Sequence, residues 1–353
     1  MRRFPWMLLG FVLLAAYPAI PGLNEGIRGT IDTSLGARLT TLFVYGMLAL
    51  GLHLIVGLTG MFHLGIGAFF GIGAFVTGIV MVKDPSYPFS WPFWVAIPLS
   101  GGIAAVVGVM LSGPTLRLRG DYLALVTLGF GEVIRYTLRN LSEITGGTRT
   151  LSPAAPDFPG FKPDQWNSGF EMQYVFCLLA LFITWVLVGN LERSRLGRAW
   201  VAMREDELAA SCMGLNIARL KLAAFALGCF IAGMAGSILA FQQGNTADPD
   251  FYGFNTSINT LSCLILGGLG SRNGVLLGVF LLFGFDRLFA DLLDNIIRSS
   301  FRIESWYLKF AFWKMGVFGL ALILFMRFRP SGLLSSSREV HSPAAPAVPE
   351  AAK

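Results

Sequence analysis

The sequence predicts an all-α membrane protein, a polytopic transmembrane helical bundle of about ten membrane helices. Of its 353 residues, 54% are hydrophobic and only 14% are charged, whereas an ordinary soluble protein is about a quarter charged. Apolar runs close to the roughly 20 residues that a membrane-spanning helix needs recur along the chain. Many of the 42 glycines lie within these runs, where small residues let helices pack closely.

The apolar runs divide the chain into one transmembrane domain, 1–334, and a tail, 335–353, whose richness in Pro, Ala and Ser predicts disorder. The first apolar run follows two arginines and is longer than a signal peptide requires, so we expect a retained helix. Membrane helices are predicted at 5–22, 41–57, 64–82, 92–112, 121–138, 172–190, 220–242, 256–269, 274–292 and 310–326.

The basic residues predict the orientation, because Lys and Arg are enriched on the cytoplasmic side of membrane proteins. With the N-terminus inside, fifteen Lys and Arg side chains fall on the inner side and nine on the outer side. We therefore expect both termini and loop 191–219 in the cytoplasm, and loop 139–171 outside. The same bias explains the net charge of +6 without any nucleic-acid partner.

Two polar segments interrupt this apolar chain. The inner one contains REDELAASCMGLNIARLKL (204–222), in which an acidic cluster precedes small residues, a glycine and basic residues. The outer one, loop 139–171, is rich in Pro and carries Phe161 and Trp166. A long loop with aromatic residues is typical of a functional segment, so we expect Phe161 and Trp166 to help dock a partner protein.

The predicted helix 121–138 carries charges that are costly in a bilayer, roughly 2.5–3.5 kcal/mol each. Asp121 stands at its beginning, where a carboxylate complements the helix dipole. Glu132 and Arg135 are three residues apart, share one face and can pair. Two interpretations stay open: a structural ion pair, or a gate along a substrate path.

Several kinds of chemistry are excluded by missing motifs. The four cysteines and three histidines lack the spacing of a metal site, so no metal is expected, and His53 and His63 are interpreted as packing or hydrogen-bonding residues. No phosphate-binding loop, metalloprotease motif or serine-hydrolase motif is present. The chain is therefore not expected to be an enzyme or to bind a cofactor itself.

The inner polar segment resembles the cytoplasmic coupling loop of ABC importer permeases. That loop has the pattern E-A-A, then three residues, then G, and Ala209, Ala210 and Gly214 match its spacing. Leu208 stands where the family has Glu, which is a departure from the pattern. The resemblance implies that an ATPase-coupling element comprises Arg204, Glu205, Asp206, Glu207, Ala209, Ala210 and Gly214.

Further blocks resemble one branch of that family, the LivM-type permease subunits of branched-chain amino acid ABC importers. They span nearly the whole chain and include Thr145-Gly146-Gly147, which the resemblance adds to Asp121, Glu132 and Arg135 as pathway or gate candidates. The other blocks are GLHLIVGLTGMFHLGIGAFFGIGAF, RLRGDYLALVTLGFGEVIR, LILGGLGSRNGVLLG and FRPSGLL.

The resemblance implies a multi-subunit importer in the bacterial cytoplasmic (inner) membrane. A second, LivH-type permease subunit would complete the translocation path for branched-chain (hydrophobic) amino acids. Two ATPase subunits would bind ATP and Mg, and an extracytoplasmic amino-acid-binding protein would deliver the substrate. The inner loop would form short helices that sit in a groove on an ATPase.

Two alternatives remain within transport. A urea or short-amide ABC permease has a similar pattern, although Leu269 stands where we expect an arginine in that branch. An ion-coupled secondary transporter would need ionisable residues near the middle of the membrane, and Glu132 is the candidate for such a role. A membrane enzyme is disfavoured by the missing motifs.

Overall fold

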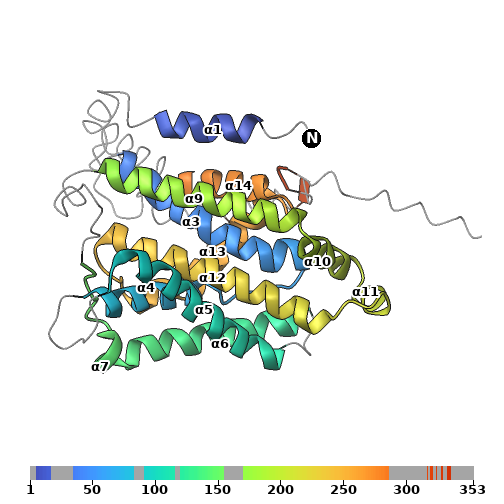
Figure 1. Ribbon diagram of the computed structural model, residues 1–353, viewed down its shortest axis with the longest axis horizontal. Coiled ribbons are helices and arrows are strands. Elements are labelled where there is room, and N and C mark those ends of the chain that lie inside the picture. The colour runs from blue at the N-terminus through green and yellow to red at the C-terminus, as the bar shows by residue number, and fades with distance from the viewer. Residues whose placement is uncertain are drawn as a thin grey trace, which may run out of the picture.

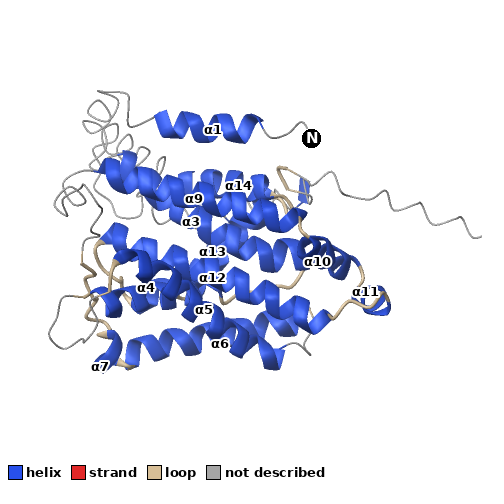
Figure 2. Cartoon of the chain, viewed as in Figure 1, coloured by secondary structure: helices blue, strands red, loops and turns tan. Residues whose placement is uncertain are grey.

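The computed structural model describes residues 5–16, 35–82, 91–115, 120–154 and 170–285, together with isolated residues between 316 and 334. Every named element in these ranges is a helix, as Figure 2 shows. The one β-type contact there is an isolated bridge between Val82 and Pro153. The prediction of an all-α fold is therefore confirmed for the described residues.

Fourteen helical elements follow one another along the described part of the chain. Their bounds are α1 Pro5–Ala16, α3 Leu35–Leu52, the π-helical turn η2 His53–Gly57, α4 Ile66–Met81, α5 Phe93–Thr115, α6 Asp121–Asn140, α7 Ser142–Thr145, α9 Phe170–Arg193, α10 Arg195–Glu205, α11 Glu207–Cys212, α12 Ile217–Gln243, the 3-10 helix η3 Pro249–Tyr252, α13 Phe254–Gly267 and α14 Arg272–Gly284.

The long helices lie side by side along the long axis of the molecule (Figure 1). Helix α12 runs through the centre and packs against α3, α4 and α5. Helix α9 packs on the other side of α3, and α6 forms one edge of the bundle. Four described helices are long and apolar enough to cross a membrane: Gly36–Gly57, Phe93–Pro114, Glu171–Arg193 and Ile217–Gln243.

The centre of the bundle is held by backbone-to-backbone contacts at glycines. A Cβ atom at Gly236 of α12 would lie 1.9 Å from the carbonyl oxygen of Phe70 on α4, and one at Gly73 would lie 2.0 Å from the carbonyl oxygen of Gly233. In α14, a Cβ at Gly278 would lie 2.1 Å from the oxygen of Cys263 on α13. The glycines therefore allow close helix packing, as predicted.

Nine of the ten predicted membrane helices overlap a described helix, but only four of these described helices are long and apolar enough to cross a membrane, so the number of ten is not confirmed. The tenth, 310–326, and the tail 335–353 lie almost wholly outside them. The prediction treated loops 139–171 and 191–219 as non-membrane segments. The structure forms the short helices α10 and α11 in the second loop, as the resemblance implied, and adds α7 to the first.

The connections gather at two opposite ends of the bundle. At one end, Arg204 reaches the carbonyl oxygen of Gly57, and Glu192 lies 3.8 Å from Arg272. At the other end, the backbone N–H of Thr246 donates to Leu151 O at 2.9 Å. Segments 58–60, 191–219 and 270–273 therefore share one end, as the charge distribution predicts, and we call it the α10–α11 end.

Candidate functional site

The segment that connects α9 to α12 is a compact pair of helices. Ser194 caps α10 by accepting from the backbone N–H of Gly197, and Asp206 caps α11 by accepting from those of Leu208 and Ala209. Such caps satisfy backbone donors that helix termini leave free. We call residues 195–214, with both helices, the α10–α11 segment; it lies beyond the ends of the long helices (Figure 1).

One face of the α10–α11 segment is anchored to the bundle. Trp200 is fully buried, and its indole N–H donates to the carbonyl oxygen of Leu220 at 2.9 Å. Glu207 pairs with the nearly buried Lys221 at 2.6 Å. Ala210 is buried as well. The segment is therefore held to the beginning of α12 by both apolar and ionic contacts.

Two large apolar side chains of the segment are exposed. Leu208 is 75% exposed and Met213 is 84% exposed, and Cys212 is exposed as well. We refer to Leu208 and Met213 together as the exposed apolar face. Large apolar side chains exposed together on a polar segment are typical of an interaction site. Sequence reasoning missed this face, because it took Leu208 only as a departure from the family pattern. The exposure of Leu208 depends on the helical register of α11, which begins at its N-cap Asp206; the sequence interpretation did not use this register.

Two of the three acidic residues make contacts within this chain. Asp206 is the cap of α11, and Glu207 is the partner of Lys221. Glu205 and Asp206 are exposed, and Glu207 is partly exposed. A charge reversal at Glu207 would place two cations together, so it would test this segment rather than a contact with another protein.

Gly214 follows α11 with a φ of +84°, a conformation that costs other residues about 1–2 kcal/mol. Apart from the two neighbours of Gly214 in the chain, no atom of the described residues lies within 4 Å of the position that a Cβ would occupy. Gly214 is therefore required by the turn, and it leaves open space where a partner can approach closely.

A second polar cluster joins α6 to η3. The guanidinium of Arg135 donates to Glu132 Oε2 at 2.7 Å, which confirms the predicted pair, and it also binds Asp250. Arg139 donates to the other oxygen of Asp250 at 2.8 Å. Sequence reasoning missed Asp250, because it lies 115 residues from Arg135 and follows a turn without a motif.

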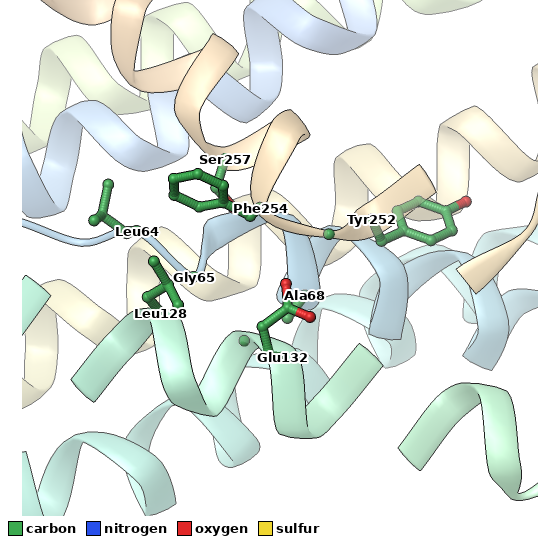
Figure 3. A pocket seen from close by; sticks show the side chains of 10 residues that line it. Leu64, Gly65, Ala68, Leu128, Glu132, Tyr252, Phe254 and Ser257 are labelled. Atoms are coloured by element: carbon green, nitrogen blue, oxygen red, sulfur yellow. The ribbon is translucent and has the colours of Figure 1, made fainter. Parts of the chain in front are cut away.

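Beside this cluster, α4, α6 and α13 enclose a small space (Figure 3). Glu132 extends from α6 toward Ala68 on α4, while Leu64, Leu128 and Phe254 gather on one side. The residues that line it leave no room for a water molecule.

The Thr145-Gly146-Gly147 motif ends α7 and folds back onto the end of α6. The Thr145 hydroxyl donates to the carbonyl oxygens of Leu138 and Leu141, and it accepts from the backbone N–H of Gly147. Both glycines have positive φ angles, +73° and +58°. The motif thus turns the chain and satisfies free carbonyls at the end of α6. The structure does not bring it into contact with Glu132.

The remaining predicted site residues are placed only in part. Asp121 is the first residue of α6. Phe161 and Trp166 lie outside the described residues.

His53 and His63, both in the connection between α3 and α4, have structural roles, as predicted. His53 Nε2 donates to Glu192 Oε1 at 3.0 Å. His63, between α3 and α4, packs edge-on against Phe225 with ring centroids 5.3 Å apart. Burial lowers the pKa of His63 to about 3, because the charged imidazolium would lose its hydration. Its ring is therefore neutral at physiological pH.

The apolar helices and their backbone contacts define a multi-pass membrane protein. The chain belongs to the family described as branched-chain amino acid transport system permease component, whose profile matches residues 34–326. It is 34% identical to the high-affinity branched-chain amino acid transport system permease protein LivM of Escherichia coli K12, over 93% of this chain and 74% of that protein.

Two further relatives cover less of the chain. The probable branched-chain amino acid transport permease protein LivM of Methanocaldococcus jannaschii is 27% identical over 68% of this chain and 67% of that protein. The LivH permease protein of Salmonella typhimurium is 26% identical over 67% and 79%, respectively. No solved structure gives a significant match.

The cluster on α6 predicts different costs for its two arginines. Replacing Arg135, 14% exposed, by Ala leaves Glu132 and Asp250 without their shared cation. We expect this to lower the free energy of unfolding by about 2 kcal/mol, between the values for exposed and buried pairs. Replacing Arg139, which is 43% exposed, by Ala should lower the free energy of unfolding by less than about 1 kcal/mol. Denaturant titration of the purified proteins measures both free energies of unfolding. Equal decreases for the two variants would contradict the assignment of Arg135 as the shared cation of Glu132 and Asp250.

Proposed function

We propose that this chain is a permease subunit of an ATP-driven importer of branched-chain amino acids. Membership of the permease family supports the role, and both LivM and LivH proteins are among its relatives. A LivH-type subunit would complete the translocation path, since relatives of both types exist. ATP and Mg would be bound by separate ATPase subunits, because the sequence contains no phosphate-binding loop.

The exposed apolar face of the α10–α11 segment is the observation that carries this proposal. The segment is anchored to α12 by Trp200 and Lys221 and exposes Leu208 and Met213 to solvent. An apolar helix face beside a glycine fits a groove on another protein. We assign this surface to an ATPase subunit, with Ala209, Ala210 and Gly214 allowing the close approach and Glu205 at its margin.

The orientation follows from the same assignment. An ATPase acts in the cytoplasm, so the α10–α11 end faces the cytoplasm and loop 139–171 the outer side. The excess of basic residues on the inner loops supports this orientation. In this account Phe161 and Trp166 remain candidates for docking a substrate-binding protein, and the C-terminal tail is cytoplasmic.

We place the substrate path next to α6. Its Glu132–Arg135 pair is a partly exposed ion pair on a helix of the apolar bundle, and such charges are unusual without a role. The pair borders the closed space among Leu64, Leu128 and Phe254, where the short helices α4 and α13 begin. At matched amounts of assembled complex, Arg135→Ala should therefore lower leucine uptake, whereas Arg139→Ala should not.

Introducing charge on the exposed apolar face should release the ATPase. With Leu208→Glu and Met213→Glu combined, we expect at least an about tenfold loss of co-purified ATPase, since interface anchors contribute about 2 kcal/mol or more each. Ala218→Glu adds charge at an exposed position at the beginning of α12 and serves as a control. Full retention of ATPase by the double variant would refute the assignment, provided that the protein inserts normally.

The native cysteines offer a test of orientation. Cys212 is exposed, whereas Cys177, Cys229 and Cys263 are buried, so a membrane-impermeant maleimide should label Cys212 alone, and only from the cytoplasm. In a Cys212→Ala background, Ser152→Cys at the opposite end should be labelled only from outside. Labelling of both positions from the same side would overturn the orientation.

A further inference from the structure

The long central helix α3 ends in a π-helical turn, His53–Gly57, whose five residues are buried. π-Helical turns are rare and frequently lie at functional sites. This turn belongs to the most deeply buried of the four long apolar spans in the described part of the chain. A displacement of the turn would therefore reach the centre of the bundle.

The first contact of this turn comes from the α10–α11 segment. Arg204, at the end of α10, donates from Nη1 to the carbonyl oxygen of Gly57 at 2.7 Å. Its side chain also lies over Gly60, where a Cβ would be only 3.0 Å from Arg204 Cγ. Arg204 thus contacts the end of α3 within its own chain, rather than only facing a partner.

A second contact comes from the junction of α9 and α10. The carboxylate of Glu192 accepts from His53 Nε2 at 3.0 Å, and its other oxygen lies 3.8 Å from Arg272 Nε at the beginning of α14. Arg272 in turn lies over the ring of Trp185, 4.4 Å from its centre, and donates to the Trp185 carbonyl oxygen. The π-helical turn is therefore held at both its beginning and its end.

We infer that the π-helical turn of α3 receives the movement of the α10–α11 segment, and that Arg204 is the positioning residue that connects them. A π-helical turn contains one residue more than an α-helical turn. Moving that extra residue along the helix displaces neighbouring residues by about 1.5 Å each. Packed interiors convert such small shifts into discrete rearrangements. Trp200 and Lys221 attach the same segment to α12, which is regularly α-helical.

This inference rests on the proposed function, because it concerns how an ATPase-docking segment acts on the membrane helices. It assigns Arg204 a role that differs from the exposed face with Leu208 and Met213. A substitution on that face should release the ATPase. A substitution of Arg204 should leave the ATPase bound and hydrolysing ATP, while transport per ATP falls.

The test uses the complete complex in liposomes, with binding protein and leucine. For Arg204→Gln we expect normal ATPase content and continued ATP hydrolysis. Leucine transported per ATP should fall about fivefold, which corresponds to the net contribution of one hydrogen bond. Arg219→Gln removes the same charge from an exposed position in the same region and should retain the wild-type ratio. An unchanged ratio for Arg204→Gln, or loss of bound ATPase, would overturn the inference.

A second variant approaches the turn from inside the bundle. A Cβ at Gly57 would lie 2.2 Å from His53 Nδ1, so Gly57→Ala must displace the His53 ring from Glu192. We expect the same fall in leucine per ATP, although Gly57 is buried away from any ATPase surface. If Gly57→Ala assembled and kept the wild-type ratio, the turn would not be part of the coupling.

Hydrogen exchange separates this role from a general loss of stability. In the wild-type complex, exchange in segment 53–60 should change between the nucleotide-free and ATP-trapped states. In Arg204→Gln, segment 207–212 should still respond to nucleotide while 53–60 should not. A response of 53–60 in the variant would contradict the connection. A wild-type complex without ATP-driven uptake would instead refute the proposed function.

Discussion

The close approach of α12 to α4 is the constraint on which the rest of this structure depends. In lipid, helices gain little from hiding apolar side chains, so van der Waals contact between backbones must hold them together. Gly236 and Gly73 permit this contact, because any Cβ there would collide with backbone of the opposite helix. The hydrogen bond from Thr77 to Ser237 adds a buried polar contact across the same pair.

This central contact also explains why the chain can carry polar elements at its ends. Helix α12 begins beside the α10–α11 segment, where Lys221 pairs with Glu207. It ends near the opposite loops, where Thr246 accepts from the backbone N–H of Leu151. Because the rigid helix α12 connects both ends of the bundle, a movement at one end can reach the other end without being absorbed by side-chain rearrangement.

The helices could be predicted from sequence because long apolar runs mark them. Nine predicted helices overlap described helices, and glycines pack the helices closely, as expected. The π-helical turn at His53 could not be predicted, since its five residues are as apolar and helix-compatible as their neighbours. It depends on contacts from Glu192 and Arg204, more than a hundred residues away.

The candidate site was predictable in location but not in detail. The polar stretch 204–222 indicated a docking element, and local spacing indicated the Glu132–Arg135 pair. The acidic residues make different contacts, and these depend on helix register. Asp206 caps α11, and Glu207 pairs with Lys221. Asp250 depended on the folding of η3 against α6, a long-range contact that no local pattern encodes.

The most direct test of the central claim is uptake of radioactive leucine into liposomes that contain this chain, a LivH-type partner and the ATPase subunits, with binding protein outside. We expect leucine to accumulate only when ATP is inside the liposomes, and we expect no accumulation when any one of these components is omitted. Accumulation by this chain alone, driven by a proton or sodium gradient without ATP, would contradict it.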